Sequence, residues 1–323
     1  MCTTYSVTWY DTTTWYDSEE IREVDFLRPS SMAEALAAKA ERPDAVPIAG
    51  GTDVMVELNF DRTRPDALLD LTGIAELAEW SDTGDGGIRL GAGVSYTRII
   101  TELGQRLPGL AMASRTVGSP QIRNRGTVGG NLGAASPAGD THPVLLATGA
   151  SVELASTRGL RTVPAEEFYV GVKRSVLAPD ELITAVLLPG TTAPQQFSKI
   201  GTRNAMVIAV CSFAIALHPE QAATGNSTVG TGIGSAGPTP LRATEAERFL
   251  TAELANADQW TSPRALDDSV RRRFGDLVAA AASPIDDVRG SAAYRRHALA
   301  VLARRTLGWA WWDYCLERTS RCA

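Results

Sequence analysis

Residues 118–140 read GSPQIRNRGTVGGNLGAASPAGD, and this glycine-rich stretch decides the fold. It lies between predicted helices at 110–117 and 143–148 and shows little regular periodicity of its own. A loop of more than about 20 residues is costly to order in a compact domain and is usually functional. The paired glycines Gly129 and Gly130 expose backbone N–H groups with no Cβ in the way, which suits a phosphate. Asp140 can accept a hydrogen bond from a ribose hydroxyl.

A shorter loop with the same character lies earlier in the chain; we call it the first loop, and residues 118–140 the second loop. The sequence IAGGTD at 48–53 follows a predicted strand at 46–49, so Gly50 and Gly51 again expose N–H groups at the end of a strand. Taken alone, a strand that runs into two glycines is more often a tight turn, and the longer stretch can equally be a structural loop that wraps its own domain. Two phosphate-binding loops in one domain favour a dinucleotide over a mononucleotide.

Alternating strands and helices are predicted around the two loops. The expected strands are 46–49, 67–71, 88–92, 151–155 and 181–188, and the expected helices are 32–41, 96–103, 110–117 and 143–148. The sequence PGTTAP at 189–194 predicts a linker. Strands at 196–200, 205–217 and 227–233 follow, and then helices at 243–255, 263–282 and 291–312. Strands followed by helices indicate a separate α+β domain.

Composition excludes several classes of function. The 323-residue chain has a formal net charge of −6, which argues against nucleic acid because phosphate binding needs clustered Lys and Arg. No apolar run reaches the roughly 18 residues that a membrane span needs. Residues 1–23 carry acidic side chains and no apolar core, unlike a secretory signal, so a cytoplasmic location is predicted. The four cysteines form no C-x-x-C pair and no zinc-ligand spacing, so the chain cannot hold an iron–sulfur cluster by itself.

Several long motifs resemble those of one known family, the FAD-binding subunits or domains of xanthine dehydrogenase and carbon monoxide dehydrogenase. Residues 117–143 match the family pattern VGSPQIRNxGTxGGNLxxxSPAGDxxP almost throughout, and residues 49–53 match its AGGTD loop. The resemblance continues through FSKIGTRNAM at 197–206, GPTPLRA at 237–243 and PIDDVRGSAAYRR at 284–296. It covers about residues 25–305, in order.

The resemblance implies an α+β fold. An FAD-binding domain of two α/β subdomains, of the vanillyl-alcohol-oxidase (PCMH) type, is expected over residues 25–190. A C-terminal α+β domain resembling the CO dehydrogenase flavoprotein, with a three-stranded antiparallel sheet and a helical bundle, is expected over residues 195–305. Residues 1–24 and 306–323 are expected to lie outside the family pattern, as a leader and a tail.

The resemblance also implies residue roles in binding FAD. The pyrophosphate is expected on both loops, the adenosine half at Asp140, the flavin ring beside Val117 and Ile183, and the polar edge of that ring at Lys199. The expected first-loop residues are Pro47, Ile48, Ala49, Gly50, Gly51, Thr52, Asp53 and Val54, and the expected second-loop residues are Thr127, Val128, Gly129, Gly130 and Asn131. Neither a catalytic side chain nor a metal ligand is expected in this chain.

Electron transfer between subunits is the implied function. A large subunit with the molybdenum cofactor oxidises the substrate, a small subunit with [2Fe–2S] clusters passes the electrons on, and this chain's FAD delivers them to a small-molecule acceptor. Such a complex is a heterotrimer that can itself dimerise. The alternatives are a stand-alone FAD oxidase or reductase that acts directly on a small molecule, and an assembly subunit that has lost FAD.

Overall fold

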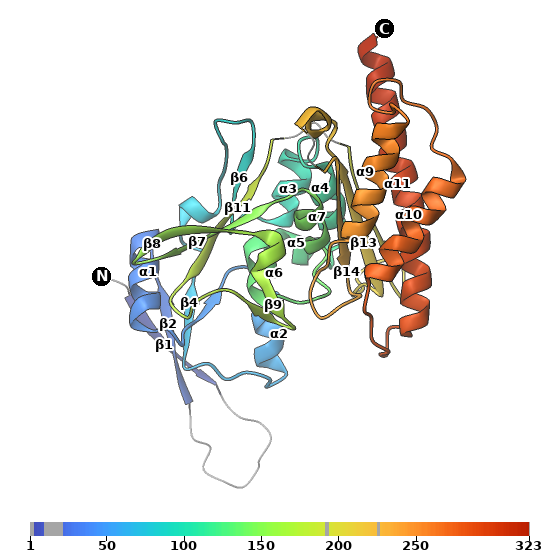
Figure 1. Ribbon diagram of the computed structural model, residues 1–323. Helices are drawn as coiled ribbons and strands as arrows, with labels where there is room; N and C mark the ends of the chain where they lie inside the picture. The colour runs from blue at the N-terminus through green and yellow to red at the C-terminus, as the bar shows by residue number, and fades with distance from the viewer. Residues whose placement is uncertain (1–2, 10–21, 191–193, 225–226, 323) are drawn as a thin grey trace.

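The computed structural model describes residues 3–9, 22–190, 194–224 and 227–322. Three sheets of three or more strands, with their helices, follow one another along the chain (Figure 1). Two of the sheets form the N-terminal domain, and the third belongs with the last three helices. Within the described residues no helix is long and apolar enough to cross a membrane.

The first sheet has four strands in the order β1-β2-β4-β3. Its strands are β1 (Thr3–Trp9), β2 (Arg22–Arg28), β3 (Val46–Ile48) and β4 (Ala67–Asp70). The last three run parallel, whereas β1 pairs antiparallel with β2 along its whole length, so part of the predicted leader adds an edge strand to this sheet. Helix α1 (Met32–Glu41) occupies the predicted range, because the Ser31 hydroxyl accepts from the Glu34 N–H at 3.2 Å and caps it. The short helix α2 (Val54–Asn59) follows the first glycine loop.

The second sheet has five antiparallel strands in the order β5-β6-β11-β7-β8. They are β5 (Trp80–Asp82), β6 (Ile88–Gly91), β7 (Ser151–Ser156), β8 (Gly159–Pro164) and β11 (Leu182–Leu188). The chain between β6 and β7 forms the helices α3 (Tyr96–Glu102), α4 (Pro108–Thr116), α5 (Pro120–Arg125), α6 (Val128–Ala134) and α7 (His142–Ala147). After β8 come α8 (Ala165–Phe168) and the small hairpin β9 (Tyr169–Gly171) and β10 (Arg174–Ser175).

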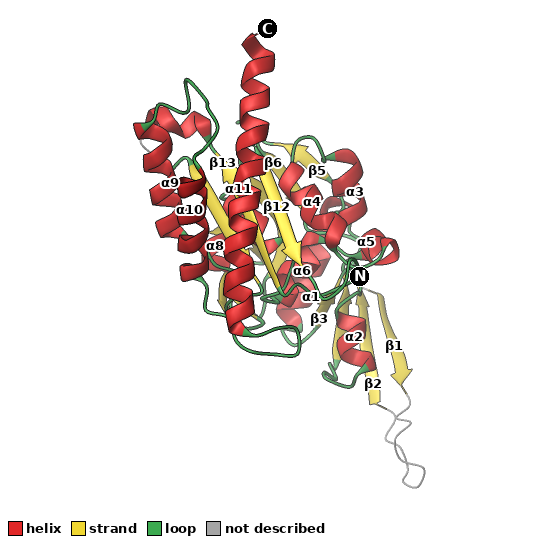
Figure 2. Cartoon of the chain, turned by 90° about the vertical axis from the view of Figure 1, so that its right-hand side faces the viewer, coloured by secondary structure: helices red, strands yellow, loops and turns green. Residues whose placement is uncertain are grey.

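The third sheet is antiparallel, with strands in the order β12-β13-β14. Its strands are β12 (Gln195–Ile200), β13 (Cys211–Leu217) and β14 (Val229–Gly234), and its helices are α9 (Thr244–Asn256), α10 (Asp268–Ala281) and α11 (Ala292–Cys322). Alternate residues of β13 belong to two cores: Ala214 and Ala216 pack with the N-terminal domain, whereas Phe213 and Ile215 pack with the helices. The strand is therefore buried on both faces (Figure 2). The predicted α+β fold is confirmed.

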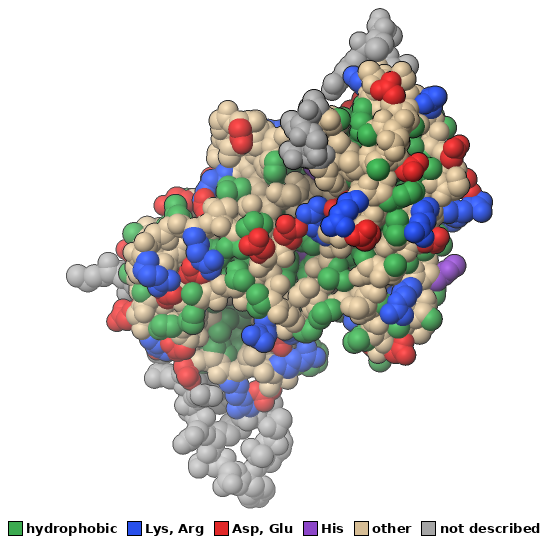
Figure 3. Space-filling model, in the orientation of Figure 1, with side chains coloured by type: hydrophobic (Ala, Val, Ile, Leu, Met, Phe, Trp, Pro, Cys, Tyr) green, Lys and Arg blue, Asp and Glu red, His purple; other side chains and the backbone are tan. Residues whose placement is uncertain are grey.

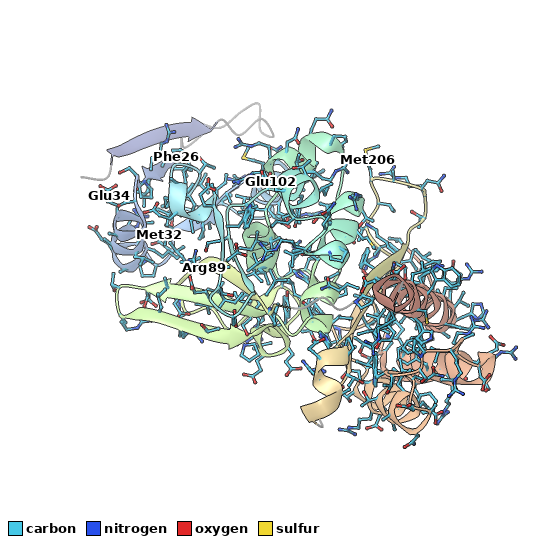
Figure 4. All side chains as sticks on the ribbon, turned by 90° about the horizontal axis from the view of Figure 1, so that it is seen from above. Phe26, Met32, Glu34, Arg89, Glu102 and Met206 are labelled. Atoms are coloured by element: carbon cyan, nitrogen blue, oxygen red, sulfur yellow. The ribbon has the colours of Figure 1, made fainter. Side chains whose placement is uncertain are left out.

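Four predictions differ from the structure, and one of them, the helix predicted at 263–282, begins only at Asp268. The stretch 118–140 contains the helices α5 and α6, because Ser119 and Thr127 cap them and Gly129 packs so closely on Ala92 that a Cβ would lie 2.5 Å from the Ala92 Cβ. The strand predicted at 205–217 begins only at Cys211, after an exposed loop with Met206 near its outer end (Figure 4). Helix α11 continues through the predicted tail as far as Cys322.

The aromatic tail divides into a buried and an exposed side. Trp311 and Tyr314 are buried, and their side chains donate to the carbonyls of Arg264 at 2.7 Å and Trp260 at 2.8 Å. Trp312, on the opposite side of the helix, is exposed. The tail is therefore part of the helical core as well as of the surface.

The charges on the surface are mixed. Over the face drawn in Figure 3, acidic and basic side chains are interspersed.

Candidate functional site

The two glycine loops lie against each other. A Cβ added to Gly50 would stand 1.8 Å from the carbonyl oxygen of Arg125, the last residue of α5 in the second loop. Gly51 adopts a left-handed φ of 75°, a conformation that disfavours any side chain. Close approach and backbone geometry thus require glycine at both positions. The sequence predicted two loops, and the structure brings them together.

The middle of the second loop is fixed to the segment that follows β6. Thr127 forms a bridge with Ser95, and the Thr127 hydroxyl accepts from the Gly130 N–H at 3.0 Å. The Gly129 N–H donates to the carbonyl of Ala92 at 3.1 Å. Gly130 itself is exposed, as a residue in a ligand cradle must be before the ligand binds. The N–H groups of Gly129 and Gly130, expected to be free, are therefore bonded within the protein, although Gly130 remains exposed.

The end of the second loop is joined to the C-terminal domain by a buried ion pair. Lys199, on β12, donates from Nζ to Asp140 Oδ2 at 2.6 Å, and both side chains are less than a tenth exposed. The Thr116 hydroxyl also donates to Asp140 Oδ2, at 3.1 Å, and the Thr116 carbonyl accepts from Lys199 at 3.3 Å. Burial raises the pKa of Asp140, and the Lys199 ammonium opposes that rise. The other oxygen, Oδ1, is buried and accepts no hydrogen bond.

The remaining predicted residues lie around this framework. Val117 is half-buried and directly follows Thr116, so it lies beside the ion pair. Ile183 is 8% exposed on β11, and its Cδ1 would lie 4.0 Å from a Cβ on Gly133, at the end of α6. In the first loop Pro47 and Asp53 are exposed, whereas the rest are half-buried. Asp140 and Lys199, expected at the two ends of FAD, are instead in direct contact.

A buried polar group lies beneath the second loop, at a position where the sequence favoured a surface or packing histidine. His142 is fully buried, and its Nδ1 lies 2.6 Å from the Tyr169 hydroxyl oxygen. Burial lowers the pKa of His142 to about 3, so the imidazole is neutral. A Cβ on Gly139 would lie 2.2 Å from His142 Nε2, which places the ring directly under the loop. A histidine two residues beyond Asp140 was the only sequence signal for this contact.

The polar groups at the two loops suit a dinucleotide better than a metal ion. The two loops present backbone amides and small side chains at a point where added Cβ atoms would collide, and one buried carboxylate oxygen still lacks a donor. Hydroxyl groups of a ribose or a ribityl chain are donors of the kind that such an oxygen accepts. Among the described residues no cluster of three or more His, Cys, Asp or Glu side chains could hold a metal ion.

Comparison with known proteins agrees with this geometry. A family model described as the FAD binding domain in molybdopterin dehydrogenase matches residues 21–191. A second, described as the CO dehydrogenase flavoprotein C-terminal domain, matches residues 196–310. The chain belongs to this family of FAD-binding subunits. Its cofactor is FAD, as the resemblance implied.

Similar members of this FAD-binding family come from several organisms. The chain is 30% identical over 292 residues to the xanthine dehydrogenase FAD-binding subunit of Escherichia coli O157:H7, covering 87% of this chain and 94% of that one. It is also 30% identical over 292 residues to the carbon monoxide dehydrogenase medium chain of Afipia carboxidovorans, covering 88% of this chain and 95% of that one. A solved structure of reconstituted CO dehydrogenase from Oligotropha carboxidovorans aligns with a TM-score of 0.79 at 27% identity, covering 89% and 97%.

Proposed function

We propose that this chain is the electron-delivering flavin subunit of a molybdenum hydroxylase complex. The observation that carries the proposal is the contact between the two glycine loops, with a buried carboxylate and ammonium at one end. FAD, when bound, accepts electrons singly or in pairs and so joins one-electron carriers to a two-electron acceptor. The partners are a large subunit with the molybdenum cofactor and a small subunit with [2Fe–2S] clusters. The complex works in the cytoplasm.

The two loops hold the FAD pyrophosphate in this proposal. The stretch from Pro47 to Val54 lines it from one side, with the backbone N–H groups of Gly50 and Gly51 as donors. Thr127 to Asn131 line it from the other side, where the N–H groups of Gly129, Gly130 and Asn131 are bonded within the protein. Because the amides carry no full charge, the protein binds the anion without basic side chains. The C-terminal domain then covers the end of the site where Lys199 lies.

Asp140 and Lys199 act together at one end of the cofactor. Atoms 2.6 Å apart cannot serve opposite ends of FAD, so we revise the expectation that Asp140 binds the adenosine half. Both side chains contact Thr116, the neighbour of Val117. Since Val117 corresponds to a residue beside the flavin ring, we place the pair at the flavin end. Asp140 Oδ1 accepts from a hydroxyl there, and Lys199 holds a positive charge near the ring.

The substrate of the complex is not encoded in this chain. Relatives of similar sequence identity to this chain belong to enzymes named for different molecules. They are named for nicotine (30% identical), caffeine (34%) and glyceraldehyde (29%). A subunit whose site binds FAD alone would vary little with the molecule oxidised elsewhere in the complex. We therefore assign the substrate pocket to the large subunit.

The decisive experiment compares the chain expressed alone with the same tagged chain purified from its own host. Alone, it should bind FAD at about one per chain, show no iron, and remain oxidised when mixed with small-molecule reductants such as xanthine or an aldehyde. From its host it should bring down two further subunits together with iron and molybdenum. A colourless chain even after incubation with FAD would overturn the proposal, and so would rapid flavin reduction by a substrate without any partner.

A further inference from the structure

A buried arginine in the C-terminal domain contacts a segment of the second loop through one residue. Arg295, on α11, is 2% exposed and donates from Nη1 to the carbonyl of Ser235 at 2.8 Å. The Ser235 N–H in turn donates to the carbonyl of Pro137, in the second loop, at 2.9 Å. The chain of contacts therefore runs from the helical bundle, through the turn after β14, to the loop.

Ser235 is held in a conformation that it does not favour. Its φ is 57°, in the left-handed region where a residue with a Cβ is disfavoured. Its hydroxyl oxygen is buried without a hydrogen bond, so the side chain does not stabilise the turn. The stabilising contact on its carbonyl comes from the Arg295 guanidinium. Arg295 thus selects the backbone geometry that aims the Ser235 N–H at Pro137.

The segment that Ser235 holds contains proposed cofactor residues. Pro137 lies three positions before Asp140, in a turn closed by the Gly139 N–H donating to the Ser136 carbonyl at 3.0 Å. A Cβ on Gly139 would lie 2.9 Å from Asn131 Oδ1, so this turn packs tightly against α6. A shift of Pro137 would therefore move Asp140 and disturb Asn131 together.

Arg295 also has a partner that provides a matched control. Its Nη2 donates to Asp287 Oδ1, while Arg289 donates to Asp287 Oδ2 from Nη2 at 2.6 Å. Together the two guanidinium groups keep the pKa of Asp287 well below its usual range. Arg289 shares the carboxylate but does not reach Ser235. Loss of Arg289 thus tests the ion pair without touching the loop.

We propose that Arg295 is a positioning residue for FAD, acting through Ser235 and Pro137 on the second loop. The proposal rests on the proposed cofactor site. It gives the C-terminal domain a part in cofactor affinity that does not depend on contact with FAD. It also accounts for a buried charge on the far side of the third sheet from the glycine loops.

The test measures FAD dissociation constants by fluorescence titration of the full chain, together with thermal midpoints of the apo forms. Arg295→Lys keeps the charge beside Asp287 but cannot span both partners, and should weaken FAD binding about tenfold, the effect of one hydrogen bond from a charged donor. Arg289→Gln should leave the dissociation constant unchanged even where it lowers the midpoint. Ser235→Gly added to Arg295→Lys should restore most of the affinity, because glycine adopts the left-handed conformation unaided.

The outcomes separate this inference from the function it rests on. Equal affinities for the wild-type chain and Arg295→Lys would overturn the positioning role while leaving FAD binding intact. A parallel loss in Arg295→Lys and Arg289→Gln, with no rescue by Ser235→Gly, would reduce Arg295 to a residue of general stability. A wild-type chain that binds no FAD would instead overturn the proposed function.

Discussion

Lys199 and Asp140, 59 positions apart, form a buried ion pair with Nζ 2.6 Å from Oδ2. One belongs to the first strand of the C-terminal sheet and the other to the end of the glycine-rich loop of the N-terminal domain. The pair therefore joins the two domains at the proposed cofactor site. Removal of either partner affects both the stability of the chain and the geometry of the site.

Substitution Lys199→Met should destabilise the chain by about 3–5 kcal/mol near pH 8, because it leaves a carboxylate buried without its cation. Without the ammonium, only the Thr116 hydroxyl still opposes the effect of burial, so the pKa of Asp140 rises further. A group whose pKa is raised in the folded state contributes stability at low pH, and this contribution is lost as the pH rises. The loss of stability in Lys199→Met should therefore shrink toward about pH 5. Urea denaturation at both pH values measures this. Lys173→Met, which removes the pair of an exposed lysine with Glu57, should have little effect on stability and vary little with pH.

Substitution Gly50→Ala should abolish FAD binding at micromolar cofactor, because the new Cβ would lie 1.8 Å from the Arg125 carbonyl oxygen and must force the two loops apart. Flavin absorbance after gel filtration with excess FAD provides the measurement. Gly84→Ala, at a position with nothing within 4 Å of the added Cβ, should bind FAD as the wild type does. Normal FAD content in Gly50→Ala would show that contact between the loops is not needed.

Acid should destabilise the chain through His142. Its pKa falls from an ordinary 6.5 to about 3 in the folded protein, because it is buried. Between these values the unfolded chain binds a proton that the folded chain does not. The free energy of unfolding should therefore decrease as the pH is lowered, by up to about 1.4 kcal/mol per pH unit. Urea denaturation of the wild type and His142→Gln between about pH 7 and about pH 5 isolates this contribution. Equal slopes would mean that another group is responsible.

Substitution Gly232→Ala should destabilise both domains together. The added Cβ would lie 1.9 Å from the carbonyl oxygen of Pro143, on α7, so strand and helix would have to separate at a cost of about 2 kcal/mol or more. A single, lowered thermal transition is the expected result. Gly171→Ala, where the nearest atoms belong to the Arg174 side chain at 3.9 Å, is the control. Two separate transitions would contradict a shared packing unit.

Local patterns predicted the elements that are anchored by their own sequence. Helix α1 and the strand β12 were predicted within one residue at each end, since their caps and alternation are local signals. Helix α6 was not predicted, because its glycines have poor helix propensity and are stabilised by packing on Ala92. The two glycine loops were identified from the sequence. The contact of Asp140 with Lys199, and of Arg295 with Ser235, depends on the folded chain and leaves no local pattern.

The six residues of α7 are all buried, and β14 places Gly230 and Gly232 where only a hydrogen fits against the helix backbone. The helix precedes the linker in the sequence, yet it packs against the sheet that follows the linker. For anyone exchanging parts between relatives, the boundary at 189–194 is therefore a misleading place to cut. A chimera joined there would pair this helix with a foreign strand, and any side chain at the positions of Gly230 or Gly232 would collide with it. Shuffled proteins should fold only when helix and strand come from one parent.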